Sequence, residues 1–310
     1  MEGLVIKSTG SWYLVLKNDG TKTECKLKGN FRIKGIKTTN PVAVGDKVDF
    51  KYLPDKRIGL ITRIHDRHNY IIRRATNLSK ISHIIAANID QVLLVVSLAK
   101  PRTSTGFIDR FLVTAEAYHI PAIIVFNKLD IYDDKLKLQH EEIVNTYETA
   151  GYKCLGVSVY ENYQIEKLKE LLKDKINLFA GHSGVGKSAI INKIEPRLNL
   201  RTKEISAYHE KGQHATTFTE MYQLSFGGFL IDTPGVKEFG LLNFKNTEVS
   251  ERFPEMRKIM MNCRFNNCTH IHEPGCAVLE ALKNGEIKQS RYNNYLSIFN
   301  DEYFDEKEWD

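Results

Sequence analysis

Residues 176–188, INLFAGHSGVGKS, run from an apolar stretch directly into a glycine-rich loop, and the helical pattern of residues 187–196 follows. Glycines in the loop allow a tight turn in which backbone N–H groups converge, and the start of a helix favours anions. A strand, such a loop and a helix in succession are the context that a phosphate-binding loop requires. The stretch therefore predicts an α/β domain that binds a chain of nucleotide phosphates.

Each part of this loop has an expected role. Lys187 would reach the β- and γ-phosphates and take part in catalysis, and the Ser188 hydroxyl would bind Mg²⁺. Backbone N–H groups would surround the phosphates. The loop residues expected to contact the nucleotide are Gly181, His182, Ser183, Gly184, Val185, Gly186, Lys187, Ser188 and Ala189.

A second motif, NKLD at residues 127–130, selects the base. It follows the apolar stretch AIIVF, and ligands collect at such strand ends in open α/β sheets. The Asp130 carboxylate can accept from the N1–H and the exocyclic amine of guanine together, a donor pair that adenine lacks. Ser158, after KCLGV, is a second expected base contact through its backbone N–H. The residues Asn127, Lys128, Leu129, Asp130 and Ser158 thus predict GTP and GDP as ligands.

A third motif, DTPG at residues 232–235, predicts contacts to Mg²⁺ and to the γ-phosphate. Asp232 would hold Mg²⁺ through a water, and the Gly235 N–H would approach the γ-phosphate. The polar stretch before it, which ends in KGQHATTF, supplies a threonine that closes over Mg²⁺. Thr216 and Thr217 are both candidates, with a slight preference for the second. The expected Mg²⁺ ligands are Ser188, Thr217 and Asp232.

Val236 follows the DTPG glycine, where many GTPases carry a glutamine that orients the attacking water. Valine cannot orient a water, so intrinsic turnover should be slow. His214, two residues before Thr216, is the candidate for positioning that water once a partner orders the segment. An ordinary solvated loop histidine is the alternative.

The N-terminal part of the chain has a different pattern from the nucleotide motifs. Five short strand patterns within residues 3–65 suit a small β-barrel, and the OB-fold is a common nucleic-acid-binding form of such a barrel. Residues 1–75 hold 16 Lys and Arg against 7 Asp and Glu, which favours contact with RNA phosphates over a merely solvated surface. Three aromatic residues could stack on bases or belong to the core: Trp12, Tyr13 and Phe31.

After a basic link at residues 71–77, IIRRATN, apolar strands alternate with helices, as in a parallel sheet. The expected strands are 90–98, 122–127, 153–158, 176–181 and 228–234. The expected helices are 105–119, 135–150, 161–175 and 187–196, with a further helix near 287–300. The predicted fold is α/β: an OB-like barrel at 1–70, a P-loop GTPase domain at 71–243, and a small α-helical domain with an acidic tail at 244–310.

Three of the five cysteines lie together in residues 263–276, CRFNNCTHIHEPGC. Cys263, Cys268 and Cys276, with His270 or His272, provide the ligand set of a closed, tetrahedral Zn²⁺ site. Reduced core thiols are less consistent with the polar neighbours of these cysteines. A metal would stabilise a small domain that cannot bury enough apolar surface alone.

The motifs stand in an unusual order, because NKLD and Ser158 precede the phosphate-binding loop instead of following DTPG. This order resembles that of the RsgA (YjeQ/YloQ) family of circularly permuted, ribosome-associated GTPases. NIDQVLLVVS at residues 88–97, the GQHATT stretch and the cysteine cluster share in the resemblance. The resemblance implies that His270 is the fourth zinc ligand. It also implies GTP hydrolysis stimulated by the small ribosomal subunit, late in the maturation of that subunit and through contacts with its rRNA.

Two other functions remain open on these residues. The chain could be a nucleotide-dependent RNA-binding module in which hydrolysis is incidental, or an ATP-using enzyme, which NKLD disfavours. No run approaches the ~20 apolar residues of a membrane span, and the start lacks the pattern of a signal peptide. We therefore expect a cytoplasmic monomer with no membrane or DNA partner.

Overall fold

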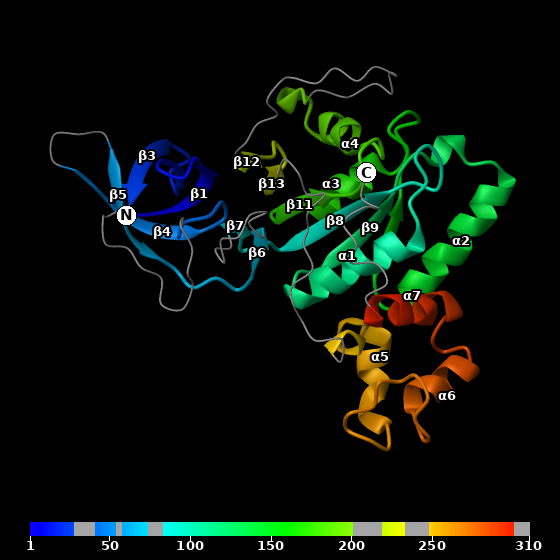
Figure 1. Ribbon diagram of the computed structural model, residues 1–310. Coiled ribbons are helices and arrows are strands. Elements are labelled where there is room, and N and C mark those ends of the chain that lie inside the picture. The colour runs from blue at the N-terminus through cyan, green and yellow to red at the C-terminus, as the bar shows by residue number, and fades with distance from the viewer. Residues whose placement is uncertain (28–40, 54–57, 74–82, 201–218, 233–247, 301–310) are drawn as a thin grey trace, which may run out of the picture. The chain divides into compact units, whose positions relative to one another are not determined.

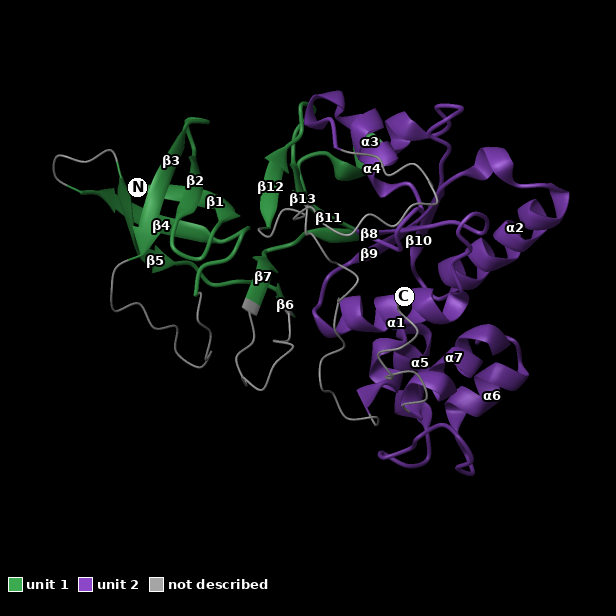
Figure 2. Ribbon diagram, turned by 45° about the horizontal axis from the view of Figure 1, so that its top comes forward, with its two compact units in different colours: residues 1–92, 169–179, 203–240 green, residues 93–168, 180–202, 241–310 purple. Residues whose placement is uncertain are grey.

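The computed structural model describes residues 1–27, 41–53, 58–73, 83–200, 219–232 and 248–300 (Figure 1). The chain forms two compact units, which Figure 2 shows in different colours. Unit 1 contains residues 1–92, 169–179 and 203–240, and unit 2 contains residues 93–168, 180–202 and 241–310. Within the described ranges, none of the helices combines the length and the apolar composition that crossing a membrane would take.

Unit 1 begins with a five-stranded barrel. Its strands are β1 (Glu2–Ser8), β2 (Tyr13–Lys17), β3 (Lys22–Leu27), β4 (Lys47–Tyr52) and β5 (Gly59–Ile64). β1 pairs with β2, β2 with β3, β3 with β5, β5 with β4, and β4 with β1, so the pairing closes on itself. Inward-facing residues such as Val5, Val15 and Phe50 fill the interior. The predicted barrel is confirmed, and Tyr13 belongs to its core.

The remaining strands of unit 1 are β6 (Tyr70–Arg73), β7 (His83–Ala87), β11 (Ile176–Ala180), whose last residue belongs to unit 2, β12 (Glu220–Gln223) and β13 (Phe229–Asp232). β11 and β13 are parallel, whereas β12 runs antiparallel to β13. β12 also pairs with β1 at Lys7 and Glu220, whose side chains form an ion pair of 3.0 Å. β6 and β7 form an antiparallel pair.

Three strands of unit 1 were not expected from the sequence. Part of the expected basic link forms β6, and β7 and β12 are additional strands. β6 and β12 have four residues each and β7 has five, so these strands are too short for the alternation of apolar and polar residues to indicate them clearly.

Unit 2 contains the strand order β8, β9, β10. These strands are β8 (Gln91–Val96), whose first two residues belong to unit 1, β9 (Ala122–Phe126) and β10 (Lys153–Gly156). All six residues of β8 are buried, as in a parallel strand with both faces covered. β9 and β10 are parallel, so their C-terminal ends lie at the same edge. The strands predicted at 90–98, 122–127 and 153–158 are therefore confirmed.

Helices follow these strands as predicted. They are α1 (Thr105–Ala117), α2 (Asp134–Thr149), α3 (Ile165–Leu172) and α4 (Lys187–Ile194), with short 3₁₀ turns η1 (Leu129–Ile131) and η2 (Pro196–Leu198). Side chains of Ser104 and Asp133 accept hydrogen bonds from the first turns of α1 and α2 and so define where these helices begin. α3 begins four residues later than predicted.

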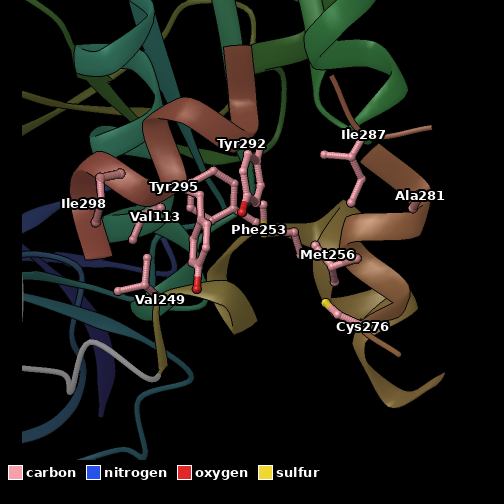
Figure 3. Packing of buried hydrophobic residues seen from close by; sticks show 11 residues of the cluster. Val113, Val249, Phe253, Met256, Cys276, Ala281, Ile287, Tyr292, Tyr295 and Ile298 are labelled. Atoms are coloured by element: carbon pink, nitrogen blue, oxygen red, sulfur yellow. The ribbon is translucent and has the colours of Figure 1, made fainter. Parts of the chain in front are cut away.

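The C-terminal module, residues 248–300, is also part of unit 2. It consists of η5 (Ser250–Arg252), α5 (Pro254–Ile259), η6 (Met260–Asn262), α6 (Ala277–Lys283) and α7 (Gln289–Phe299). Its apolar core includes Phe253, Met256 and Tyr295, and Val113 of α1 belongs to the same cluster (Figure 3). The expected helical content of this segment is thus present, and the module packs on α1.

Candidate nucleotide-binding and metal sites

The phosphate-binding loop lies between β11 and α4, as the sequence predicts. Gly181, Gly184 and Gly186 have φ values of +134°, +82° and +99°, where a side chain is strained. A Cβ atom on Gly181 would collide with the Val95 carbonyl, and one on Gly186 with the Asn127 amide. The loop therefore needs glycine both for its conformation and for the close approach of its neighbours.

The loop presents hydrogen-bond donors suited to an anion. Lys187 Nζ donates to the Gly181 and His182 carbonyls, at 2.6 Å each, which holds the ammonium beside the loop. α4 begins at Lys187 without a side-chain cap, because its N-cap residue is Gly186. N–H groups of an uncapped first turn are the donors that bind phosphate at helix N-termini.

The NKLD motif packs directly against this loop. Asn127 Nδ2 donates to the Val185 carbonyl at 2.9 Å, and Lys128 Nζ donates to the Gly184 carbonyl at 2.8 Å. Lys128 also donates to the Lys100 carbonyl. Two motifs more than fifty residues apart in the sequence thus form one structure.

One polar group near this contact, unpaired among the described residues, indicates a ligand. Within the described part of the chain, Asn127 Oδ1 is buried without a hydrogen-bond partner, and such a buried acceptor is costly unless something pairs with it. Burial lowers the pKa of Lys128, and the Asp130 carboxylate partly offsets this effect. A guanine nucleotide that lies along the two motifs would bring polar groups to both.

Ser158 makes contacts in the structure that the sequence did not predict. Its Oγ donates to Asp130 Oδ1 at 2.6 Å and accepts from the Glu161 N–H at 3.0 Å, which fixes the orientation of the carboxylate. Its backbone N–H donates to the Tyr163 carbonyl at 3.3 Å instead of pointing freely toward a base. In this geometry Ser158 positions Asp130, and the contact of its N–H with guanine would require the bond to Tyr163 to break.

Other contacts at the site had no signal in the sequence. The Tyr132 hydroxyl donates to the Asn127 carbonyl at 3.3 Å and accepts from the Leu98 N–H at 2.8 Å. These two hydrogen bonds hold the NKLD motif in place at the end of β9. The ring of Phe107 packs on that of His182, with 3.7 Å between centroids. Tyr132 and Phe107 belong to no motif, and their contacts join segments that are distant in the sequence.

The remaining predicted nucleotide residues are distributed as follows. Ser188 and Ala189 lie in the first turn of α4, and Leu129 lies in η1. Asp232 ends β13 in unit 1. The other four positions of interest lie outside the described residues: His214, Thr216, Thr217 and Gly235, together with the neighbouring Val236.

The four predicted zinc ligands come together in the C-terminal module. One donor atom from each of Cys263, Cys268, His270 and Cys276 lies within 4.8 Å of all the others. His270 Nδ1 is 3.6 Å from the Cys263 Sγ and 3.4 Å from the Cys276 Sγ, and the two sulfurs are 4.0 Å apart. Ligand atoms around a tetrahedral Zn²⁺ lie about 3.5 to 3.8 Å apart, so the arrangement fits this ion.

The surroundings of the cluster hold His270 in place and disfavour charge on the free ligands. Burial raises the pKa of Cys268 to about 12 and lowers the pKa of His270, so a metal that binds here would have to displace the thiol proton of Cys268. The loop that carries His270 is held on α7, because Tyr292 and Tyr295 donate to the His270 and Thr269 carbonyls at 2.8 Å and 2.5 Å. His270 is buried, whereas His272, the rival ligand, is exposed and outside the four-residue cluster.

Comparison with known proteins agrees with this architecture. The sequence model of the RsgA GTPase family matches residues 64–242. The sequence model of the RsgA N-terminal domain family matches residues 2–61. The small ribosomal subunit biogenesis GTPase RsgA of Flavobacterium johnsoniae is 54% identical over 305 residues, which cover 96% of this chain and 92% of that protein. The protein of the same name from Bacteroides fragilis is 51% identical over 301 residues, 97% of each chain.

Two solved structures are also similar over most of their length. YjeQ from Thermotoga maritima has a TM-score of 0.80 and 35% identity, with 97% of both chains covered. YloQ, described as a circularly permuted GTPase, has a TM-score of 0.75 and 31% identity, with 97% of this chain and 94% of that chain covered. The permuted order of the motifs here agrees with that description. This chain therefore belongs to the RsgA GTPase family and is a circularly permuted, GTP-hydrolysing enzyme.

Proposed function

We propose that this enzyme hydrolyses GTP during the maturation of the small ribosomal subunit, and that the subunit stimulates the reaction. The part of this proposal that concerns GTP rests on the contact between the phosphate-binding loop and NKLD. In this contact Asn127 and Lys128 donate hydrogen bonds to the Val185 and Gly184 carbonyls. The ribosomal part is supported by the names of relatives that are about half identical over nearly the whole chain. In this role the chain acts in the cytoplasm as a monomer.

The proposed reaction needs charge stabilisation on the γ-phosphoryl group. Lys187 lies at the loop carbonyls, and with nucleotide bound its ammonium would contact the β- and γ-phosphates. When bound, Mg²⁺ neutralises phosphate charge; Ser188, Asp232 and either Thr217 or Thr216 would hold it. Asp130, oriented by Ser158, would pair with guanine and exclude adenine.

The attacking water needs a separate positioning group. Val236 stands where a glutamine would orient this water, so the unstimulated rate should be low. We assign the role to His214, in the segment that also carries Thr217. Binding of the subunit would bring His214 to the attacking water, so turnover would depend on a partner.

The barrel is the proposed rRNA contact. Trp12 is 36% exposed, and the Lys26 ammonium lies 4.2 Å from the centre of its ring. An exposed aromatic residue beside a cation can stack on an unpaired base while the cation meets the phosphate backbone. The excess of Lys and Arg in residues 1–75 supports the same assignment.

The test is GTP turnover by the purified protein alone, with small subunits, and with large subunits, with ATP as the control nucleotide. We expect strong stimulation by small subunits only, and Lys187→Ala should reduce stimulated turnover by about a hundredfold or more. His214→Ala should remove the stimulation but leave GDP affinity unchanged. Tight GTP binding without stimulation would refute the proposal and favour a binding module in which hydrolysis is incidental.

A further inference from the structure

Helix α1 touches the nucleotide site at its first turn. Ser104 caps this turn by accepting from the Phe107 N–H, and the Phe107 ring packs on His182 of the phosphate-binding loop with 3.7 Å between ring centres. The His182 carbonyl in turn accepts from the Lys187 ammonium at 2.6 Å. The position of α1 therefore affects a loop residue that is bonded to the catalytic lysine.

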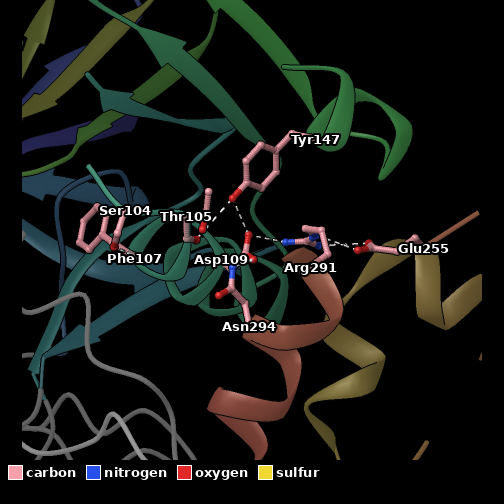
Figure 4. A network of polar contacts seen from close by, with 8 residues as sticks. All are labelled: Ser104, Thr105, Phe107, Asp109, Tyr147, Glu255, Arg291 and Asn294. Atoms are coloured by element: carbon pink, nitrogen blue, oxygen red, sulfur yellow. Dashed lines mark hydrogen bonds and ion pairs between the residues drawn. The ribbon is translucent and has the colours of Figure 1, made fainter. Parts of the chain in front are cut away.

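The same helix is anchored to the C-terminal module half a turn further on. Asp109 is fully buried, and its Oδ1 accepts from Arg291 Nη1 at 2.6 Å. Arg291 lies on α7, is 2% exposed, and also donates from Nε to Glu255 Oε1 of α5 at 2.7 Å. Figure 4 shows Arg291 between the two carboxylates, so one guanidinium joins α1, α5 and α7.

Neutral donors complete this buried network. One arginine facing two carboxylates leaves an excess negative charge. Tyr147 of α2 donates to Asp109 Oδ1 at 2.7 Å, and Asn294 of α7 donates to Asp109 Oδ2 at 2.5 Å. With each oxygen of Asp109 bonded from a defined direction, the geometry of α1 relative to α7 is tightly specified. Loss of the arginine would leave carboxylates buried without a counter-ion, and α1 would have to shift or admit water.

The network also reaches the metal site. α7, which carries Arg291, holds the loop of His270 and Thr269 through the hydroxyls of Tyr292 and Tyr295. A continuous series of packed and bonded groups thus runs from the cysteine cluster through α7 and α1 to His182. We propose that Arg291 is a positioning residue for the nucleotide site: by fixing Asp109, it sets the position of Phe107 against the phosphate-binding loop.

This inference rests on nucleotide binding at the site described above, and the binding of a fluorescent GDP analogue, mant-GDP, to the unchanged protein tests that premise separately. The decisive measurement is the rate of mant-GDP dissociation from zinc-loaded protein. Arg291→Met should increase this rate between about twofold and thirtyfold. Phe107→Leu should have a similar effect. Arg291→Lys should restore part of the wild-type behaviour.

The route through α1 is tested by combining the substitutions. If Arg291 acts through Phe107, the double variant should release mant-GDP no faster than the faster single variant. A matched control is Arg257→Met, which removes an exposed ion pair of 2.9 Å between the C-terminal module and Glu116, near the far end of α1. That variant should leave dissociation unchanged.

Folding is checked by zinc content and circular dichroism. If Arg291→Met does not fold, Asn294→Ala replaces it, because this change removes one neutral hydrogen bond to Asp109 and should give a smaller increase in the same direction. Unchanged dissociation in a folded, zinc-loaded Arg291 or Asn294 variant would overturn the inference. So would simple multiplication of the two single effects in the double variant.

Discussion

At the scale of single residues, the nucleotide site consists of close contacts between groups whose types cannot be exchanged. Gly186 must be glycine because its φ is +99° and because the Asn127 amide occupies the space of a Cβ atom. Asp130 is the guanine contact that we propose, and its carboxylate accepts a hydrogen bond from the Ser158 hydroxyl at 2.6 Å. These constraints lead to two predictions.

Asp130→Asn should change the base that the enzyme accepts. The amide would present a donor to the guanine N1–H, so affinity for GDP should fall by about a hundredfold, whereas xanthine, with a carbonyl in place of the amine, should gain affinity. Competition between mant-GDP and either GDP or xanthosine diphosphate measures the switch. Asp134→Asn, on an exposed aspartate of α2, is the control and should preserve guanine preference. Retained guanine preference in the Asp130 variant would refute the role of Asp130.

Gly186→Ala should abolish nucleotide binding with only a modest loss of stability. Alanine at positive φ costs about 1–2 kcal/mol, and the added methyl group would also displace Asn127 from the loop. Gly20→Ala is the matched control, because Gly20 has a φ of +81° but open space around it among the described residues. The melting temperature should fall by a similar amount in both variants, and only the Gly186 variant should lose its affinity for mant-GDP. Equal nucleotide affinity in the two variants would contradict the expected effect of the collision with Asn127.

At the scale of helices and strands, the sequence predicted the elements that have a strong local pattern, such as a long apolar run or an N-cap residue. β8 and β9 are long apolar runs, and α1 and α2 begin at Ser104 and Asp133, which are typical N-cap residues. β12 escaped prediction because its four residues are stabilised by pairing with β13 and β1, not by their own composition.

The same distinction applies to the site. The position of the phosphate-binding loop between a strand and a helix was predictable, because a short local sequence specifies it. The contact of Phe107 with His182 and the ion pair of Arg291 with Asp109 join segments separated by 75 and 182 residues, respectively, so only the folded chain reveals them. Ser158 shows the intermediate case, since its place at the site was predictable but the role of its hydroxyl was not.

The proposed zinc site of the C-terminal module leads to a prediction about zinc content. His270→Ala should reduce bound zinc from one ion per chain to nearly none, because a buried ligand is lost, whereas His272→Ala should leave the zinc content unchanged. Elemental analysis measures the content, and proteolysis measures the stability of residues 248–300. Acidification should release the metal from the unchanged protein, because protons compete for the thiolates and the imidazole. If the His272 variant alone loses zinc, the choice of His270 is wrong.

At the scale of the whole molecule, the permuted order of the nucleotide motifs determines which module follows the DTPG motif in the sequence. In this chain the DTPG motif begins at the end of β13, and residues 236–247 separate it from the C-terminal module. We propose that a change in the DTPG segment between the GDP and GTP states is passed along the chain to α5, which follows this segment in the sequence. The C-terminal module is also joined to α1 by the ion pair of Arg291 with Asp109.

This arrangement predicts that hydrogen exchange in the C-terminal module depends on the nucleotide. We expect the amides of residues 248–300 to exchange at different rates with GDP and with a non-hydrolysable GTP analogue, and the difference should diminish in Arg291→Met, which uncouples α7 from α1. β2 and β3 of the barrel serve as an internal reference, because they contain neither a nucleotide motif nor a contact with β12 among the described strands. Identical exchange in the module with both nucleotides would mean that GTP turnover is not transmitted there, and that a partner must sense the nucleotide state through the DTPG and threonine segments directly.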